Sequence, residues 1–218
     1  MIKICTLYAQ WGLGLEAVKF LESECSDLTV FTALHKNRDY GRCVYDYCVD
    51  RGITVVDVLE DSGWLEFAAS LRPDILISVS FGFKLPPSLC SQAKYAAINY
   101  HQSLLPEFRG PDPLGNFMLS DNRFVGVSVH ELVRTFDAGP VYSQMSWAVS
   151  DEETLESLND TCKAVLPFAL QVAFRQILRG AKPVSQDENR ASTAPSLGLS
   201  WHLSRRELRQ KRATEANS

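Results

Sequence analysis

Three polar residues in the middle of the chain have the types and spacing of a small reactive site. The apolar run 95–100 predicts a buried strand, and side chains two apart on a strand point to one face, so Asn99 and His101 should project together where it ends. Asp137 follows in a segment beside Gly139, whose flexibility lets that segment fold back over the strand end. An amide, an imidazole and a carboxylate that meet there can donate hydrogen bonds to a developing oxyanion and relay a proton.

The first half of the chain alternates strands with helices, which is what positions such a site. Its expected strands are 2–8, 28–34, 53–58, 74–80 and 95–100, and its expected helices are 14–24, 39–51 and 63–71. Strands joined by helices at this spacing pair in parallel through right-handed crossovers, so we predict an α/β fold with a doubly wound, mostly parallel, Rossmann-like sheet. Ligands bind beyond the carboxyl ends of such strands, which directs attention to segments 81–86 and 101–113.

The second half changes pattern. Its expected elements are a short helix over 112–120, an antiparallel strand pair over 126–132 and 141–149, and a long helix over 151–178. Pro167 inside the long helical pattern indicates either a kink or two abutting helices. The basic segment 203–212 is expected to fray or to lie on the surface as a solvated helix. We therefore divide the chain into one domain over residues 1–180 and a C-terminal tail over 181–218.

The composition bounds the classes of function. A chain of 218 residues with 45% hydrophobic content can bury one core, and a net charge of -4 gives no broad electrostatic reason to expect binding to DNA or RNA. Six cysteines without a C-x-x-C pair fit a reduced, cytoplasmic setting, and no apolar stretch is long enough to span a membrane. We expect a cytoplasmic protein with neither nucleic acid nor membrane as partner.

The sequence gives little support for three other kinds of chemistry, namely metal binding, dinucleotide binding and catalysis by a nucleophilic serine. The four histidines lack metal-ligand spacing, so no metal is expected. The segment Gly12-Leu13-Gly14 hints at dinucleotide binding, but Ala17 rather than glycine closes the pattern. Ser, His and Asp are all present, yet no G-x-S-x-G nucleophile elbow occurs.

The residues from about 74 to 144 carry a dense set of recognisable motifs. The pattern Asn-x-His-x-Ser-Leu-Leu-Pro-x-x-Arg-Gly-x-x-Pro begins at Asn99, Gly-Val-Ser-Val-His spans 126–130, and Phe-Asp-Ala-Gly-Pro-Val spans 136–141. Together they resemble the formyltransferase family that uses 10-formyltetrahydrofolate. The resemblance implies that Asn99, His101 and Asp137 are the catalytic trio.

The resemblance also implies where the folate is held. The loop after the fourth strand falls on Phe83, Lys84 and Leu85, and a second loop falls on Leu132 to Phe136, with Val133 inside it. In that family the main chain of the first of these loops supplies much of the contact with the folate.

Formyl transfer explains why such residue types are needed. The reaction passes through a tetrahedral intermediate with a negative oxygen, to which Asn99 and a protonated His101 can donate, each donor being worth roughly 10² to 10³ in rate. Asp137 could orient His101, favour its charged form and hold a water that relays the proton, worth roughly 10² to 10⁴.

Three further residues bear on the site. Arg109 either binds an anionic acceptor or pairs with a surface acid. For His130 a structural hydrogen-bonding role is favoured over a catalytic one. Asn116 stands where many relatives of this family have tryptophan, which changes the wall of the acceptor pocket.

Departures from the family narrow the acceptor. Members that formylate initiator methionyl-tRNA carry an additional C-terminal domain, and only a short tail follows Gly180, so tRNA is not expected. Purine-pathway members have a Gly-Asn-Gly-Ser-Asn type of loop that Gln10 to Gly14 does not match. We therefore expect a primary amine, foremost that of a nucleotide-linked amino sugar. The alternatives are another small amine of specialised biosynthesis, hydrolysis of formyltetrahydrofolate, and a folate- or nucleotide-binding module without turnover.

Overall fold

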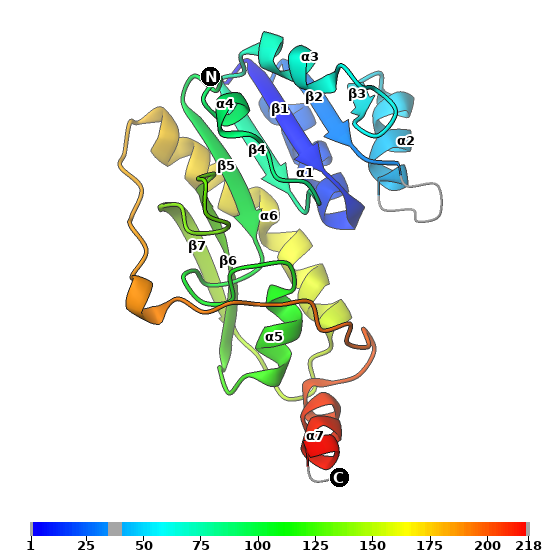
Figure 1. Cartoon of the computed structure of the whole chain (residues 1–218), viewed down its shortest axis with the longest axis vertical. Coiled ribbons are helices and arrows are strands. Elements are labelled where there is room, and N and C mark those ends of the chain that lie inside the picture. Colours follow the sequence, from blue (N-terminus) through cyan, green and yellow to red (C-terminus); the bar gives the residue numbers. More distant parts are fainter. Residues whose placement is uncertain (1, 35–40, 217–218) are drawn as a thin grey trace.

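The computed structural model of the chain describes residues 2–34 and 41–216. Within them, a seven-stranded sheet has the order β3-β2-β1-β4-β5-β6-β7 (Figure 1). Its strands are β1 Ile4–Ala9, β2 Asp27–Thr32, β3 Thr54–Asp57, β4 Ile75–Val79, β5 Ala96–His101, β6 Phe124–Glu131 and β7 Val141–Ala148. The strands from β3 to β5 are parallel to one another, whereas β6 runs antiparallel to both β5 and β7. This architecture confirms the predicted α/β fold and its antiparallel edge.

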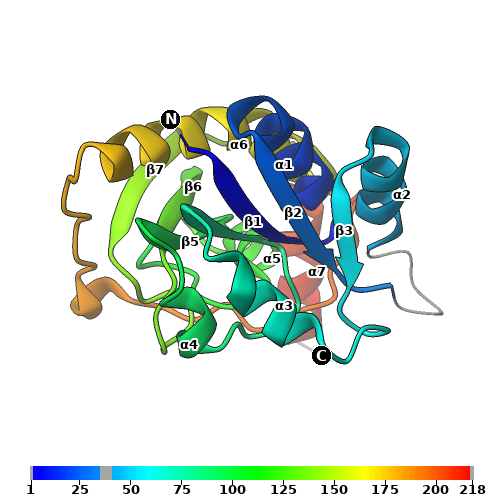
Figure 2. The ribbon, with the colours of Figure 1, turned by 90° about the horizontal axis from the view of Figure 1, so that it is seen from above.

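Helices cover both faces of the sheet (Figure 2). Those described are α1 Trp11–Glu24, α2 Arg42–Arg51, α3 Trp64–Leu71, α4 Pro87–Cys90, α5 Pro113–Leu119, α6 Leu155–Leu178 and α7 Arg205–Ala216, with a 3-10 turn η1 at Glu188–Arg190. α1, α2 and α6 pack on one face over a large apolar core, and α3 and α4 pack on the other over a smaller core around Tyr8 and Phe31. The expected start of the second helix at Asp39 lies outside the described residues.

The carboxyl ends of β1 and β4 mark the point where the strand order reverses. β4 is buried at all five positions, as is typical of a central parallel strand covered on both faces. Gln10 closes this point: its Oε1 accepts from Gly82 N at 2.8 Å and its Nε2 donates to Ala33 O at 3.5 Å. A buried side chain therefore occupies the place where dinucleotide-binding folds use a glycine-rich turn.

α6 is a single helix of 24 residues through Pro167, so two abutting helices are not observed. It begins at Leu155, four residues later than the expected start, because Thr154 and Ser157 form a reciprocal capping box. None of the helices in the described ranges 2–34 and 41–216 is long and apolar enough to cross a membrane.

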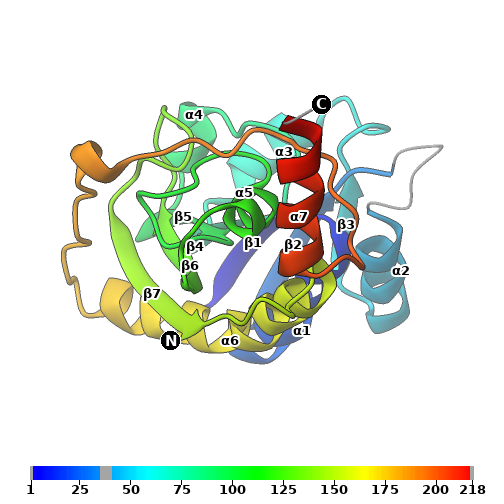
Figure 3. The same ribbon diagram turned by 90° about the horizontal axis from the view of Figure 1, so that it is seen from below.

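Residues 181–204 form an extended segment that we call the strap. It runs from the end of α6 across the loop after β5 and on to α7, and is drawn in orange in Figures 1 and 3. Val184 exchanges two backbone hydrogen bonds with Val141 on β7, at 2.8 and 2.9 Å. Further along, Arg109 N donates to Ser192 O at 2.9 Å. The strap is thus attached to the sheet edge and to the loop after β5, while the division at residue 180 stays a prediction.

α7 shows that the expectation of a fraying tail was wrong at its first turn. Arg205 is 2% exposed, its Nη2 donates to Ser120 O at 2.7 Å and also to Asn122 O, and its guanidinium lies 4.8 Å from the centre of the Phe117 ring. Leu208 is buried as well. The rest of the helix is mostly exposed, as expected for a basic segment.

Candidate active site

Asn99 and His101 lie on one face at the carboxyl end of β5, as their spacing predicts. Because β6 runs antiparallel to β5, Asn99 is directly opposite His130, and His101 is opposite Ser128. Asn99 Nδ2 is 3.1 Å from His130 Nε2. The two strands therefore present an amide and two imidazoles on the same face of the sheet.

Asp137 joins this group from the segment between β6 and β7. Its Oδ2 is 3.7 Å from His101 Nδ1 and its Oδ1 is 3.4 Å from His130 Nε2. The Oδ2 atom also accepts from Gly110 N at 2.9 Å. Asp137 has a φ of 52°, in the left-handed region that aspartate tolerates better than most residues. The structure thus brings the amide, imidazole and carboxylate together.

His130 has a larger part in this cluster than its isolated position in the sequence indicates. Its Nδ1 donates to Glu131 O at 2.8 Å, because a carbonyl oxygen can only accept. Its Nε2 lies 3.1 Å from Asn99 Nδ2 and 3.4 Å from Asp137 Oδ1, so His130 lies between the amide and the carboxylate. A structural hydrogen-bonding role, the interpretation favoured from sequence, agrees with these contacts.

His101 is buried and has a defined tautomer. Its Nε2 lies 2.8 Å from Phe108 O and must donate there, so the neutral ring has its lone pair on Nδ1, facing Asp137. Burial lowers the pKa of His101 below its ordinary 6.5, although Asp137 and the bond to Phe108 act to raise it. The expectation of a protonated His101 is therefore not supported for the free protein at neutral pH.

Asp137 is ionised in the same environment. Burial acts to raise its pKa, but the hydrogen bond with His130, the neighbouring His101 and the Gly110 N–H together hold that pKa below 3.8. At neutral pH the site therefore contains a carboxylate beside the unprotonated Nδ1 of His101. A proton that reaches Nδ1 is stabilised by Asp137, as an acid-base relay requires.

Mild acid should destabilise the folded protein through His101. Because the pKa of His101 is lower in the folded than in the unfolded chain, the unfolded chain binds more protons, and stability falls as the pH drops below 6.5. The stabilisation from Asp137 is lost only below 3.8. We expect the free energy of unfolding in urea to decrease from about pH 7.5 to about pH 5.5, and His101→Gln to flatten this decrease. Equal slopes in both proteins would contradict the placement of His101.

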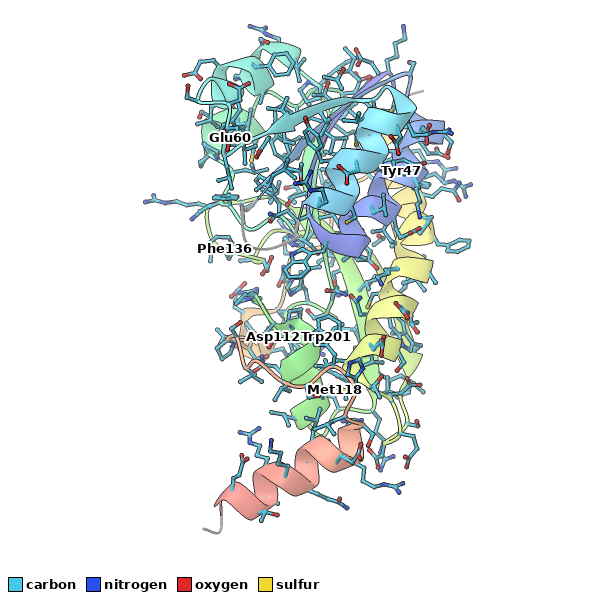
Figure 4. All side chains as sticks on the ribbon, turned by 90° about the vertical axis from the view of Figure 1, so that its right-hand side faces the viewer. Tyr47, Glu60, Asp112, Met118, Phe136 and Trp201 are labelled. Atoms are coloured by element: carbon cyan, nitrogen blue, oxygen red, sulfur yellow. The ribbon has the colours of Figure 1, made fainter. Side chains whose placement is uncertain are left out.

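The two loops expected to hold folate contact each other beside this cluster. Lys84 Nζ lies 4.9 Å from the centre of the Phe136 ring, and Leu85 and Leu132 belong to the same small core. Phe83 packs on Phe81 with ring centres 5.4 Å apart. Phe136, labelled in Figure 4, is largely exposed, and Phe83 and Val133 are partly exposed. The two loops thus present apolar, partly exposed side chains that a flat heterocycle can cover.

Arg109 pairs with an acid, the second of its two interpretations. Its Nη1 and Nη2 bind Glu188 Oε2 and Oε1 at 2.9 and 2.7 Å, and its Nε and Nη2 bind Gln186 Oε1 at 3.1 and 2.7 Å. Asn116 donates both of its amide hydrogens to backbone, to Asp112 O and Pro195 O at 2.8 Å each. It therefore fastens the strap to α5. Among residues 2–34 and 41–216, no group of three or more His, Cys, Asp or Glu side chains is arranged so that it could hold a metal ion.

A comparison with protein families agrees with this geometry. The sequence model of the family described as formyl transferase matches residues 57–171, more than half of the chain. The chain therefore belongs to the formyl transferase family, which confirms the resemblance read from its motifs. The matched range includes β4, β5, the β6–β7 pair and the whole Asn99, His101 and Asp137 group.

The curated relatives of this chain have about 30% sequence identity to it. A methionyl-tRNA formyltransferase of Bacillus velezensis is 32% identical over 134 residues, which are 61% of this chain and 42% of that protein. The chain spans about half the length of the curated relatives it matches.

Solved structures share the fold at low sequence identity. One is an N-formyltransferase from Helicobacter canadensis in complex with folinic acid and dTDP-3-aminofucose. Its TM-score is 0.69 and its sequence identity 16%, and the match covers 88% of this chain and 70% of that chain. A phosphoribosylglycinamide formyltransferase from Bacillus halodurans has a TM-score of 0.68 at 19% identity, covering 82% of this chain and 96% of its own. These likenesses concern the fold.

Proposed function

We propose that the chain transfers a formyl group from 10-formyltetrahydrofolate to a primary amine. The observation that carries the proposal is the convergence of Asn99, His101 and Asp137 at the carboxyl end of β5, with 3.7 Å between His101 Nδ1 and Asp137 Oδ2. Membership of the formyl transferase family supports it independently. In this proposal the loops that contain Phe83 to Leu85 and Leu132 with Val133 hold the folate.

Each polar group then has a defined task. The folate supplies an activated formyl group whose oxygen becomes negative as the amine nitrogen bonds to its carbon. The Asn99 amide, which lies against His130, donates an N–H to that oxygen. The attacking amine must lose a proton while the departing nitrogen gains one, and the unprotonated Nδ1 of His101 accepts and returns that proton beside Asp137.

For the acceptor we propose a nucleotide-linked amino sugar. Support comes from the fold shared with the Helicobacter canadensis enzyme, whose complex contains such a sugar nucleotide. Methionyl-tRNA is the second candidate, because curated relatives such as those of Bacillus velezensis and Bacillus subtilis are methionyl-tRNA formyltransferases. Another small amine, formate release to water, and folate binding without turnover remain as alternatives.

One assay separates these functions. The protein is incubated with 10-formyltetrahydrofolate and, in parallel, with a dTDP-linked amino sugar, with methionyl-tRNA, or with no amine, while absorbance follows tetrahydrofolate release and mass spectrometry follows the acceptor. We expect a formylated amino sugar and little release without amine. Formylated methionyl-tRNA would change the acceptor, and full-speed release without amine would identify a hydrolase. Folate binding without any release of tetrahydrofolate would identify a binding module.

A further inference from the structure

The strap places one amide side chain between the two loops that hold the polar cluster. Gln186 is half-buried and lies in the strap between Val184, which pairs with Val141 at the start of β7, and η1. It belongs to none of the three sequence motifs from which the site was expected.

The Gln186 amide is fully used in hydrogen bonds. Its Nε2 donates to Asp137 O and to Gly139 O, both at 2.7 Å, so each of its hydrogens has a carbonyl acceptor. Its Oε1 accepts from Arg109 at 3.1 and 2.7 Å. Arg109 is held in turn by the bidentate contact with Glu188. One side chain therefore connects the backbone on both sides of Ala138 to the loop after β5.

Both connected segments also determine the geometry of the reacting groups. Gly110, next to Arg109, donates its N–H to the Asp137 carboxylate, and Phe108, on the other side, supplies the carbonyl that His101 Nε2 binds. A shift of either loop would change the 3.7 Å separation between Asp137 Oδ2 and His101 Nδ1. The loop that contains Asp137 has little room to adjust, since a Cβ on Gly139 would lie 1.9 Å from Glu131 O.

We propose that Gln186 is a positioning residue for the Asp137 and His101 pair, acting through the backbone of the Asp137 loop and through Arg109. The kinetic effect expected from Gln186 rests on the formyl-transfer function proposed above. Its structural effect is independent of that function. Glutamine suits the task because it has two donors and an acceptor on one planar group, whereas a carboxylate would lack the donors and an alkyl group would lack both.

Gln186→Met tests this role because methionine has a similar length and no charge but removes all four hydrogen bonds. We expect kcat for formyl transfer to fall about 10- to 100-fold, because loosely held reacting groups lose their alignment, with KM for the formyl donor changing less than about 3-fold. Gln176→Met, on the exposed side of α6, is the matched control and should keep the parent rate.

A second readout needs no substrate. Asp137 raises the pKa of His101, so a displaced Asp137 should lower that pKa in Gln186→Met, as followed by NMR titration of the His101 ring. An unchanged His101 titration overturns the proposal whether or not kcat falls, because a fall alone would then reflect general loosening. If the parent protein transfers no formyl group, the proposed function fails, and the titration still decides whether Gln186 positions the pair.

Discussion

His101→Ala is expected to lower kcat for formyl transfer about 10³-fold or more, because it removes the group that exchanges the proton and the partner of the Asp137 carboxylate. The dissociation constant for the folate should change less than about 3-fold, since the loops expected to hold it, 83–85 and 132–136, do not include His101. Single-turnover kinetics would measure the rate, and fluorescence titration with a non-reacting folate would measure affinity.

The same substitution at a surface histidine provides the control. The His202 side chain is 80% exposed and pairs with Glu156, so His202→Ala should keep the parent rate. Because His101→Ala leaves Phe108 O without its donor, thermal melting should confirm that the variant is folded. Transfer at the parent rate by folded His101→Ala would refute the mechanism.

Arg205→Ala is expected to lower the free energy of unfolding by about 2 to 4 kcal/mol. The substitution removes the donor to two backbone carbonyls, Ser120 O and Asn122 O, and empties the space over the Phe117 ring. Urea denaturation followed by circular dichroism measures the change, and limited proteolysis should show earlier cleavage near α7.

Arg206 is the matched control for this effect. It is adjacent in sequence, its side chain is 60% exposed, and it pairs with the equally exposed Glu152. Arg206→Ala should therefore change the free energy of unfolding by less than about 0.5 kcal/mol. Equal effects of the two substitutions would mean that α7 is not anchored through Arg205.

The fold was predictable because the order of its strands and helices follows from the local periodicity of apolar residues. β4 and the strands beside it are short apolar runs separated by helical patterns, and their spacing alone implies parallel crossovers. Asn99 and His101 were placed on one face by the two-residue repeat of a strand. The proximity of Asp137 was expected from the flexible segment beside it and from the family resemblance, and the structure supplies the distance.

The remaining contacts depend on long-range pairing. The bond between Asn99 and His130 follows from the antiparallel register of β5 and β6, which no local pattern reveals. Gln186 and Arg205 lie outside the periodic segments and act through backbone carbonyls far away in sequence. The lowered pKa of His101 could not be predicted without knowing that the side chain is buried, because the neighbouring Asp137 alone would raise that pKa.

The strap has a consequence for the order of events during synthesis. The loop after β5 receives backbone hydrogen bonds from Ser192 and Ala194, which leave the ribosome long after the whole sheet has been made. Until then the hydrogen bonds of Arg109 to the strap cannot form, and the carboxylate and imidazole beside it lack that support. A nascent chain can therefore complete its sheet well before it has a competent reaction centre.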